Sequence, residues 1–161
     1  YFGGGEDSYG YLVGDFVRDK DAVSAAAIFA ELIAYYKTQG KNAIDVLAEI
    51  YSKFSFFKES LISVTKKGKD GAEQIQALMN GFRTNPPTEM NGIEVERIVD
   101  VKNSTITHVK TGKVEKLNMD KSNVMQFYLS DGSRISARPS GTEPKIKYYF
   151  SVSAPISDPK D

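Results

Sequence analysis

The sequence predicts an α+β protein in which two helices come first and an antiparallel sheet with one further helix follows. Apolar residues recur every three or four positions over most of residues 21–54, which is the period of a helix. From Ile93 onward apolar and polar residues alternate instead, as in strands with one buried face, and Thr111-Gly112 and Asp131-Gly132 separate the runs as turns. We therefore expect two domains, at residues 1–56 and 57–161.

The first helix is predicted from Asp21 to about Lys37, with Asp21 as its N-terminal cap and Gly40 as its end. Because this helix is apolar nearly all round, we expect it to be buried. Asn42 is predicted to cap a second helix, whose apolar residues fall on one stripe. Little sheet accompanies these helices, so we expect this third of the chain to expose apolar surface or to require a partner that covers it.

The second domain is predicted to begin with a strand at residues 61–65 and to continue with a helix. Asp70 and Glu73 have the spacing of a capping box, and Asn85-Pro86-Pro87 ends the helix. The inner face of this helix is expected to hold Ile75, Leu78, Met79 and Phe82.

A polar loop, Arg138-Pro139-Ser140-Gly141-Thr142-Glu143-Pro144, lies between two alternating runs that read as strands. The Arg138 guanidinium can bind two oxygens of a phosphate, and the hydroxyls of Ser140 and Thr142 can donate to others. A positive φ at Gly141 would turn backbone N–H groups inward as an anion nest. A hairpin turn that happens to be rich in Ser, Gly and Thr is the alternative. Arg138 and the lysines at 145 and 147 favour an anion site.

A glycine-rich stretch near the start carries Glu6 and Ser8. A carboxylate can accept hydrogen bonds from two neighbouring sugar hydroxyls, and a serine can donate or accept. The alternative is a disordered terminus. Asp19 and Asp21 have the spacing of some cation loops, but helix capping explains Asp21 more simply, so we predict no metal site. Lys20 is a weaker candidate for ligand contact.

The composition excludes several classes of protein. Twenty-one basic and twenty-one acidic residues give zero formal charge, which argues against nucleic acid as a partner. No apolar run approaches the ~20 residues that cross a bilayer, so we expect no membrane partner. The absence of cysteine excludes disulfides, thiolate metal sites and cysteine nucleophiles, and it is compatible with the cytoplasmic location that we expect.

Two motifs resemble loops of the α-D-phosphohexomutases, the phosphoglucomutase and phosphomannomutase family. RPSGTEPKIK, from Arg138, resembles the family's phosphate-binding loop, and GEDSYG, from Gly5, resembles its sugar-binding loop. The resemblance implies that residues 1–56 are the C-terminal part of the sugar-binding α/β domain, the family's third. It implies that residues 57–161 are the fourth domain, with a TATA-binding-protein-like antiparallel sheet. The implied ligand contacts are Glu6 and Ser8 for the sugar, Arg138, Ser140, Gly141, Thr142 and Lys147 for the phosphate, and Lys20 and Lys145 as possible further contacts.

The resemblance also implies a function, which is to position a hexose phosphate while phosphate moves between its 1 and 6 positions. In the family a phosphoserine, Mg²⁺ and a hexose 1,6-bisphosphate take part. The sequence contains neither the serine loop nor the metal loop, so we expect a fragment that lacks the N-terminal domains, holds no catalytic residue and is inactive alone. GEDSYG leans toward the glucose-type branch. The alternative is a non-enzymatic module that binds an anion or a protein partner.

Overall fold

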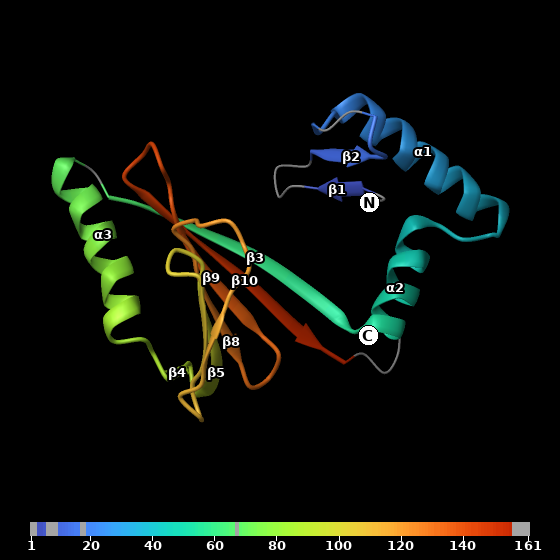
Figure 1. Cartoon of the computed structure of the whole chain (residues 1–161). Coiled ribbons are helices and arrows are strands. Elements are labelled where there is room, and N and C mark those ends of the chain that lie inside the picture. Colours follow the sequence, from blue (N-terminus) through green and yellow to red (C-terminus); the bar gives the residue numbers. More distant parts are fainter. Residues whose placement is uncertain (1–2, 6–9, 17–18, 67, 156–161) are drawn as a thin grey trace. The chain divides into compact units, whose positions relative to one another are not determined.

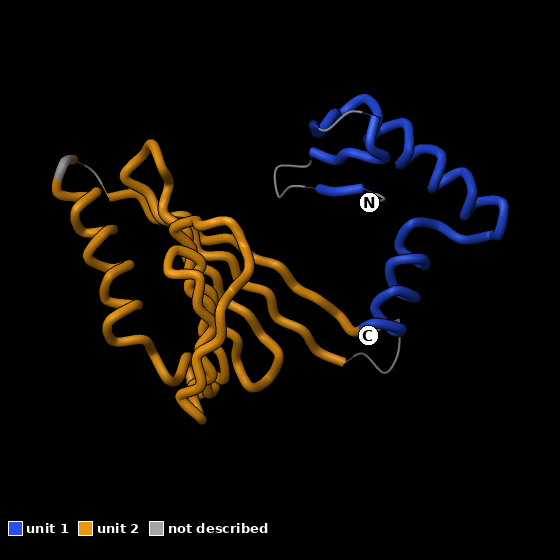
Figure 2. The backbone as a smooth tube through the Cα atoms, viewed as in Figure 1, with its two compact units in different colours: residues 1–54, 156–161 blue, residues 55–155 orange. Residues whose placement is uncertain are grey.

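The computed structural model describes residues 3–5, 10–16, 19–66 and 68–155, which belong to two compact units (Figure 1). The first unit holds the described residues up to Phe54, and the second holds Ser55–Pro155 (Figure 2). The first contains β1 (Gly3–Gly5), β2 (Tyr11–Val13), α1 (Ala22–Thr38) and α2 (Ala43–Phe54). The second contains β3 (Phe56–Thr65), α3 (Lys69–Thr84), β4 (Glu89–Met90), β5 (Ile93–Asp100), β6 (Thr105–His108), β7 (Val114–Lys116), β8 (Met125–Leu129), β9 (Arg134–Pro139) and β10 (Lys145–Ala154). These elements confirm the predicted α+β class.

Both helices of the first unit begin at side-chain caps, as predicted. The Asp21 carboxylate accepts hydrogen bonds from the backbone N–H groups of Val23, at 3.0 Å, and Ser24, at 2.8 Å. Asn42 Oδ1 accepts from the backbone N–H of Asp45 at 3.1 Å, while the Asp45 carboxylate accepts from the N–H of Asn42 at 2.9 Å. The second start is therefore a reciprocal capping box, in which each side chain satisfies a backbone donor of the other residue.

The helices of the first unit have no buried residue in the described structure, so the prediction of a buried first helix is wrong for this chain. Val23 is 78% exposed and Ile44 is 71% exposed, which confirms the predicted apolar surface. The sheet described in this unit consists only of β1 paired with β2, three residues each, and it is too small to cover the helices. An apolar groove of about 310 Å³ is lined by Phe29, Leu32, Ile33, Tyr36, Ala43, Ile44, Val46, Leu47 and Ile50.

The second unit is built on an antiparallel sheet with the strand order β3-β10-β9-β8-β5-β6-β7, and β4 pairs with β5. The longest ladder joins β10 to β3 over ten residue pairs, from Lys145 opposite Thr65 to Ala154 opposite Phe56. On its other side β10 pairs with β9, where Lys147 lies opposite Arg138. The last strand of the unit is therefore an interior strand of the sheet.

The core of the second unit lies between α3 and one face of the sheet (Figure 1). Met79 of α3 is fully buried, and the Phe82 and Phe127 rings meet edge to face with centroids 5.5 Å apart. The prediction that Leu78 belongs to the inner face of this helix is wrong, because Leu78 is 40% exposed. The buried cluster consists of Ile75, Met79, Val95, Ile98, Met125, Phe127, Leu129, Ala137 and Ile146.

The start of α3 differs from the predicted capping box at Asp70 and Glu73. The helix begins at Lys69, two residues earlier than that cap would place it, after Gly68, whose φ is +82°, and no side chain caps it. Gly71 packs so closely on the chain before it that a Cβ there would lie 2.2 Å from the carbonyl oxygen of Lys66. The tight approach thus sets the start of the helix. Asp70 falls within the first turn, where a carboxylate still interacts favourably with the positive end of the helix dipole.

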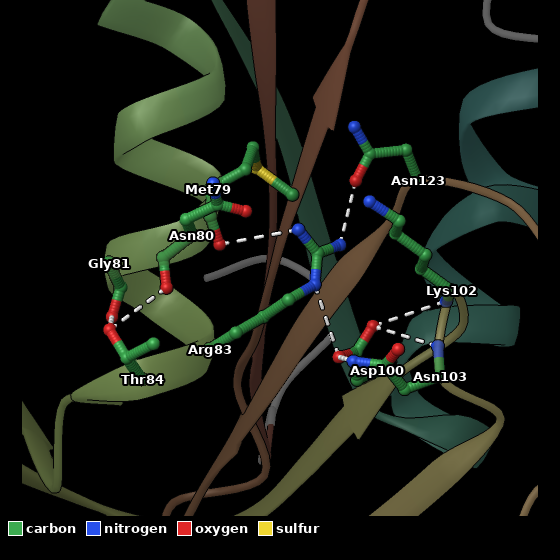
Figure 3. A network of polar contacts seen from close by, with 9 residues as sticks. All are labelled: Met79, Asn80, Gly81, Arg83, Thr84, Asp100, Lys102, Asn103 and Asn123. Carbon is green, nitrogen blue, oxygen red and sulfur yellow. Dashed lines mark hydrogen bonds and ion pairs between the residues drawn. The ribbon is translucent and has the colours of Figure 1, made fainter.

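A polar network fastens the C-terminal end of α3 to the sheet (Figure 3). Arg83 Nε donates to the Asp100 carboxylate at 3.1 Å, and Arg83 Nη2 donates to Asn123 Oδ1 at 2.7 Å. A third donation goes to the carbonyl oxygen of Met79. Asp100 in turn accepts from Asn103 Nδ2 at 2.6 Å and from backbone N–H groups of the turn that follows β5. Arg83 and Asp100 are nearly buried, so the network satisfies charges that would otherwise be costly to remove from water.

Candidate functional site

The predicted anion-binding loop joins β9 to β10 and is held firmly at both ends. Arg138 of β9 lies opposite Lys147 of β10, and the Ser140 N–H donates to the carbonyl oxygen of Lys145 at 2.8 Å. At the far end, the Lys66 N–H donates to the carbonyl oxygen of Pro144 at 2.8 Å. The sheet therefore presents the loop in one position, which lowers the entropy lost when a ligand binds.

Inside the loop, Ser140 folds back on the backbone. Its Oγ accepts from the N–H groups of Thr142, at 3.4 Å, and Glu143, at 3.2 Å. The predicted positive φ at Gly141 is wrong, because this residue is not among those with a positive φ. The Ser140 side chain makes the turn instead, so a left-handed residue is not needed. Gly141 leaves open space, with no atom within 4 Å of where a Cβ would stand.

The charged groups of the loop converge on a pocket of about 300 Å³. Most of the predicted phosphate contacts line it, but Thr142 does not. The lining residues are Arg138, Pro139, Ser140, Gly141, Glu143, Lys145, Lys147 and Tyr149. Three cations and one carboxylate give the pocket a positive balance, and its size falls within the range of small-molecule sites.

Three lining residues, Pro139, Glu143 and Tyr149, were not among the predicted contacts. Glu143 forms an ion pair with Lys145 at 2.9 Å. The hydrogen bond and the positive charge of Lys145 hold the pKa of the Glu143 carboxyl below its usual value. The alternation of β10 already placed Tyr149 on the same side as both lysines, so sequence could have identified it as a pocket residue. The pairing of Glu143 with Lys145 depends on the turn and had no signal in the sequence.

The predicted sugar contacts belong to the first unit. Glu6 and Ser8 lie outside the described residues, although Gly5 and Tyr11, which bracket them in the sequence, pair between β1 and β2. Lys20 is exposed, and its Nζ lies 3.9 Å from the Asp19 carboxylate. Its side chain also lies so close to Gly10 that a Cβ there would be 2.5 Å from Lys20 Cδ.

The described residues contain no group of three or more His, Asp or Glu side chains that could hold a metal ion. Asp21, which the sequence predicted as a helix cap and not as a metal ligand, uses both carboxylate oxygens as the cap of α1. Within the part of the chain that the structure describes, each helix is too short or too polar to cross a lipid bilayer.

Two family models match the chain. The one described as phosphoglucomutase/phosphomannomutase, alpha/beta/alpha domain III, matches residues 1–54, and the one described as the C-terminal domain matches residues 61–154. A phosphoglucomutase of Staphylococcus aureus strain N315 is 39% identical over 153 residues, and that of strain USA300 is 40% identical over the same length. Each match covers 95% of this chain, and the chain spans about 28% of the length of these relatives.

A solved structure of pp63/parafusin from Paramecium, titled as a phosphoglucomutase in its open form, has the same fold. The TM-score is 0.60 at 17% sequence identity, and the match covers 94% of this chain and 25% of that one. At this identity the likeness concerns the fold alone. Together with the two family models, which cover most of the sequence, these matches show that the chain belongs to the phosphoglucomutase/phosphomannomutase family.

Proposed function

We propose that the chain is the part of a phosphohexose mutase that binds the non-reacting phosphate and positions the sugar hydroxyls. The whole enzyme would be an isomerase that moves phosphate between the 1 and 6 positions of a hexose. Membership of the family and the name of the relatives support this activity. The observation that carries the proposal is the positively charged pocket around Ser140, with Arg138, Lys145 and Lys147 in its lining.

The pocket acts by holding one phosphate in place. Arg138 can donate two parallel hydrogen bonds to phosphate oxygens, and the lysines add positive charge. The N–H groups of Thr142 and Glu143 now donate to Ser140 Oγ, so a phosphate oxygen could take its place while the serine hydroxyl turns to donate. Fixing one phosphate orients the rest of the substrate, which lowers the entropic part of the barrier at the other end.

Recognition of the sugar hydroxyls remains assigned to Glu6 and Ser8, and Lys20 and Lys145 remain candidates for a further ligand contact. The sequence motif GEDSYG supports the first pair and favours a glucose phosphate. Thr142 keeps a place in the proposal through its backbone N–H, because its side chain does not line the pocket. We place the whole protein in the cytoplasm.

The magnesium ion of the family does not fit the described residues, which offer no group of three carboxylates or histidines. No step is therefore assigned to a metal in this chain. The nucleophilic serine, the metal site and the activation by a hexose 1,6-bisphosphate are assigned to N-terminal domains of the same polypeptide, the expected partner of this part. The chain alone should bind a hexose phosphate without converting it, as a coupled mutase assay would show.

An NMR titration of the ¹⁵N-labelled chain with inorganic phosphate tests the proposed site. The amides of residues 140–143 should shift at millimolar phosphate. Arg138→Ala should weaken binding by about tenfold to a hundredfold, because hydrogen bonds to charged groups contribute roughly 1.5–3 kcal/mol. Arg134→Ala is the matched control, since it removes an exposed arginine from the same strand outside the pocket lining. Equal effects of the two substitutions, or shifts on another surface, would contradict the proposal.

A further inference from the structure

Tyr149 brings an aromatic ring to a pocket whose other side chains are mostly charged or polar. It lies two residues after Lys147 on β10 and therefore on the same face of the sheet. Tyr149 lines the pocket, and Lys147 Nζ lies 5.9 Å from its ring centroid. A pocket that had only to hold an inorganic anion would gain little from such a ring.

The packing of the second unit does not account for this ring. Its neighbours along the strand, Tyr148 and Ile146, face α3, where Ile146 is a member of the buried core and Tyr148 packs against it. Tyr149 points to the opposite face and is half-buried. There it is flanked by Leu61 of β3, which is 44% exposed, and by Ser136 of β9. Tyr149 and Leu61 thus form an accessible apolar strip beside the cationic part of the pocket.

The register of the strands sets how far this strip lies from the phosphate contacts. Arg138 and Lys147 form one cross-strand row, and Ser136, Tyr149 and Leu61 form the next row on the same face. Rows two residues apart are separated by about 7 Å along the strands. This spacing lets a phosphate ester held by the first row place its carbon atoms over the second. One face of a hexose ring presents mainly C–H groups, which suit the electron-rich face of an aromatic ring.

We propose that Tyr149, supported by Leu61, is a specificity-determining contact that binds the carbon skeleton of a phosphorylated hexose next to the anchored phosphate. The inference rests on the proposed function of the loop and adds a second contact to it. The phosphate row binds any phosphate, whereas the Tyr149 row distinguishes a sugar phosphate from inorganic phosphate. The ring is the element required, since the phenol hydroxyl has no part in this contact.

The test compares two ligands and uses three substitutions in addition to Arg138→Ala. Affinities for inorganic phosphate and for glucose 6-phosphate are measured by NMR titration. Tyr149→Leu should weaken the binding of glucose 6-phosphate by about threefold to tenfold, which is the usual contribution of one aromatic contact. It should leave the binding of inorganic phosphate unchanged. Tyr149→Phe, which keeps the ring, should bind both ligands as the parent does. Tyr128→Leu is the matched control, because it removes another tyrosine from the same face, outside the pocket lining.

The outcomes separate this inference from the function on which it rests. Suppose that Arg138→Ala weakens the binding of both ligands, while Tyr149→Leu weakens the binding of both equally or of neither. The phosphate site then stands, and the sugar contact is refuted. A Tyr128→Leu effect as large as that of Tyr149→Leu would also refute it. If neither ligand shifts the loop amides of the parent chain, the proposed function itself fails. The amide spectrum of each variant verifies that the sheet is intact.

Discussion

Replacing Arg83 with methionine should destabilise the second unit far more than replacing an exposed arginine. Arg83→Met keeps an unbranched side chain on α3 but removes the three hydrogen bonds to Asp100, Asn123 and the carbonyl oxygen of Met79. The side chains of Arg83 and Asp100 are 11% and 10% exposed, so the carboxylate left behind can reach little water.

The size of the effect follows from this burial. Removing one partner of a buried ion pair costs roughly 3–5 kcal/mol. Asp100 keeps its hydrogen bonds from Asn103 and the backbone, so the lower end applies, about 3 kcal/mol. At about 4–8 °C per kcal/mol for a unit of this size, the Tm should fall by about 12–24 °C.

Thermal unfolding followed by the methyl NMR signal of Met79, buried in this unit, measures the change. Arg134→Met is the control, because Arg134 is exposed on β9. Adding Asp100→Asn to Arg83→Met removes the unpaired charge and should recover part of the loss. A fall in Tm no larger than that of Arg134→Met, or no recovery in the double variant, would refute this account of the network.

Two further predictions concern charges at the surface. Glu143→Gln should tighten the binding of inorganic phosphate by about twofold to fivefold at low salt, because Lys145 is then free of its 2.9 Å ion pair. A titration that shows weaker binding would contradict this prediction. Backbone hydrogen bonds from Ser24 and then Val23 lower the pKa of Asp21 below its ordinary value of 3.8. At a pH above the ordinary pKa the Asp21 carboxylate fully stabilises the start of α1, and this contribution is lost as the pH falls through the lowered pKa. The amide shifts of the first turn should follow this titration in the parent chain and not in Asp21→Asn, where the amide still caps the helix.

Local signals were sufficient for much of the fold. The caps at Asp21 and Asn42 depend on residues within three positions, and both were predicted correctly. The cap at Asp70 was wrong because the close approach of Gly71 to Lys66, a contact that the spacing does not reveal, sets the start of α3. No strand was predicted at β1, since three glycines have low strand propensity and only their pairing with β2 makes them a strand.

In the candidate site too, local signals predicted some features, and contacts formed only in the fold decided the others. The residue types and the alternation of β10 identified Arg138, Ser140 and Lys147, which the structure brings to one pocket. The backbone of the loop was less predictable, because the Ser140 side chain replaces the positive φ expected at Gly141. The charge balance also depended on the folded turn, which pairs Glu143 with Lys145. The role proposed for the sugar contacts remains a prediction.

The interior position of β10 has a consequence for how the second unit folds. In the described sheet β10 joins β3 to β9, so residues 56–65 find their partners only in residues 145–154. Closing the loop between these two strands costs conformational entropy before the contacts of the ladder form, and this cost slows folding. During synthesis β3 must wait until almost the whole unit has left the ribosome. Because the loop between β9 and β10 is also held by the hydrogen bond from the Lys66 N–H to the carbonyl oxygen of Pro144, the pocket should be among the last features of the unit to form.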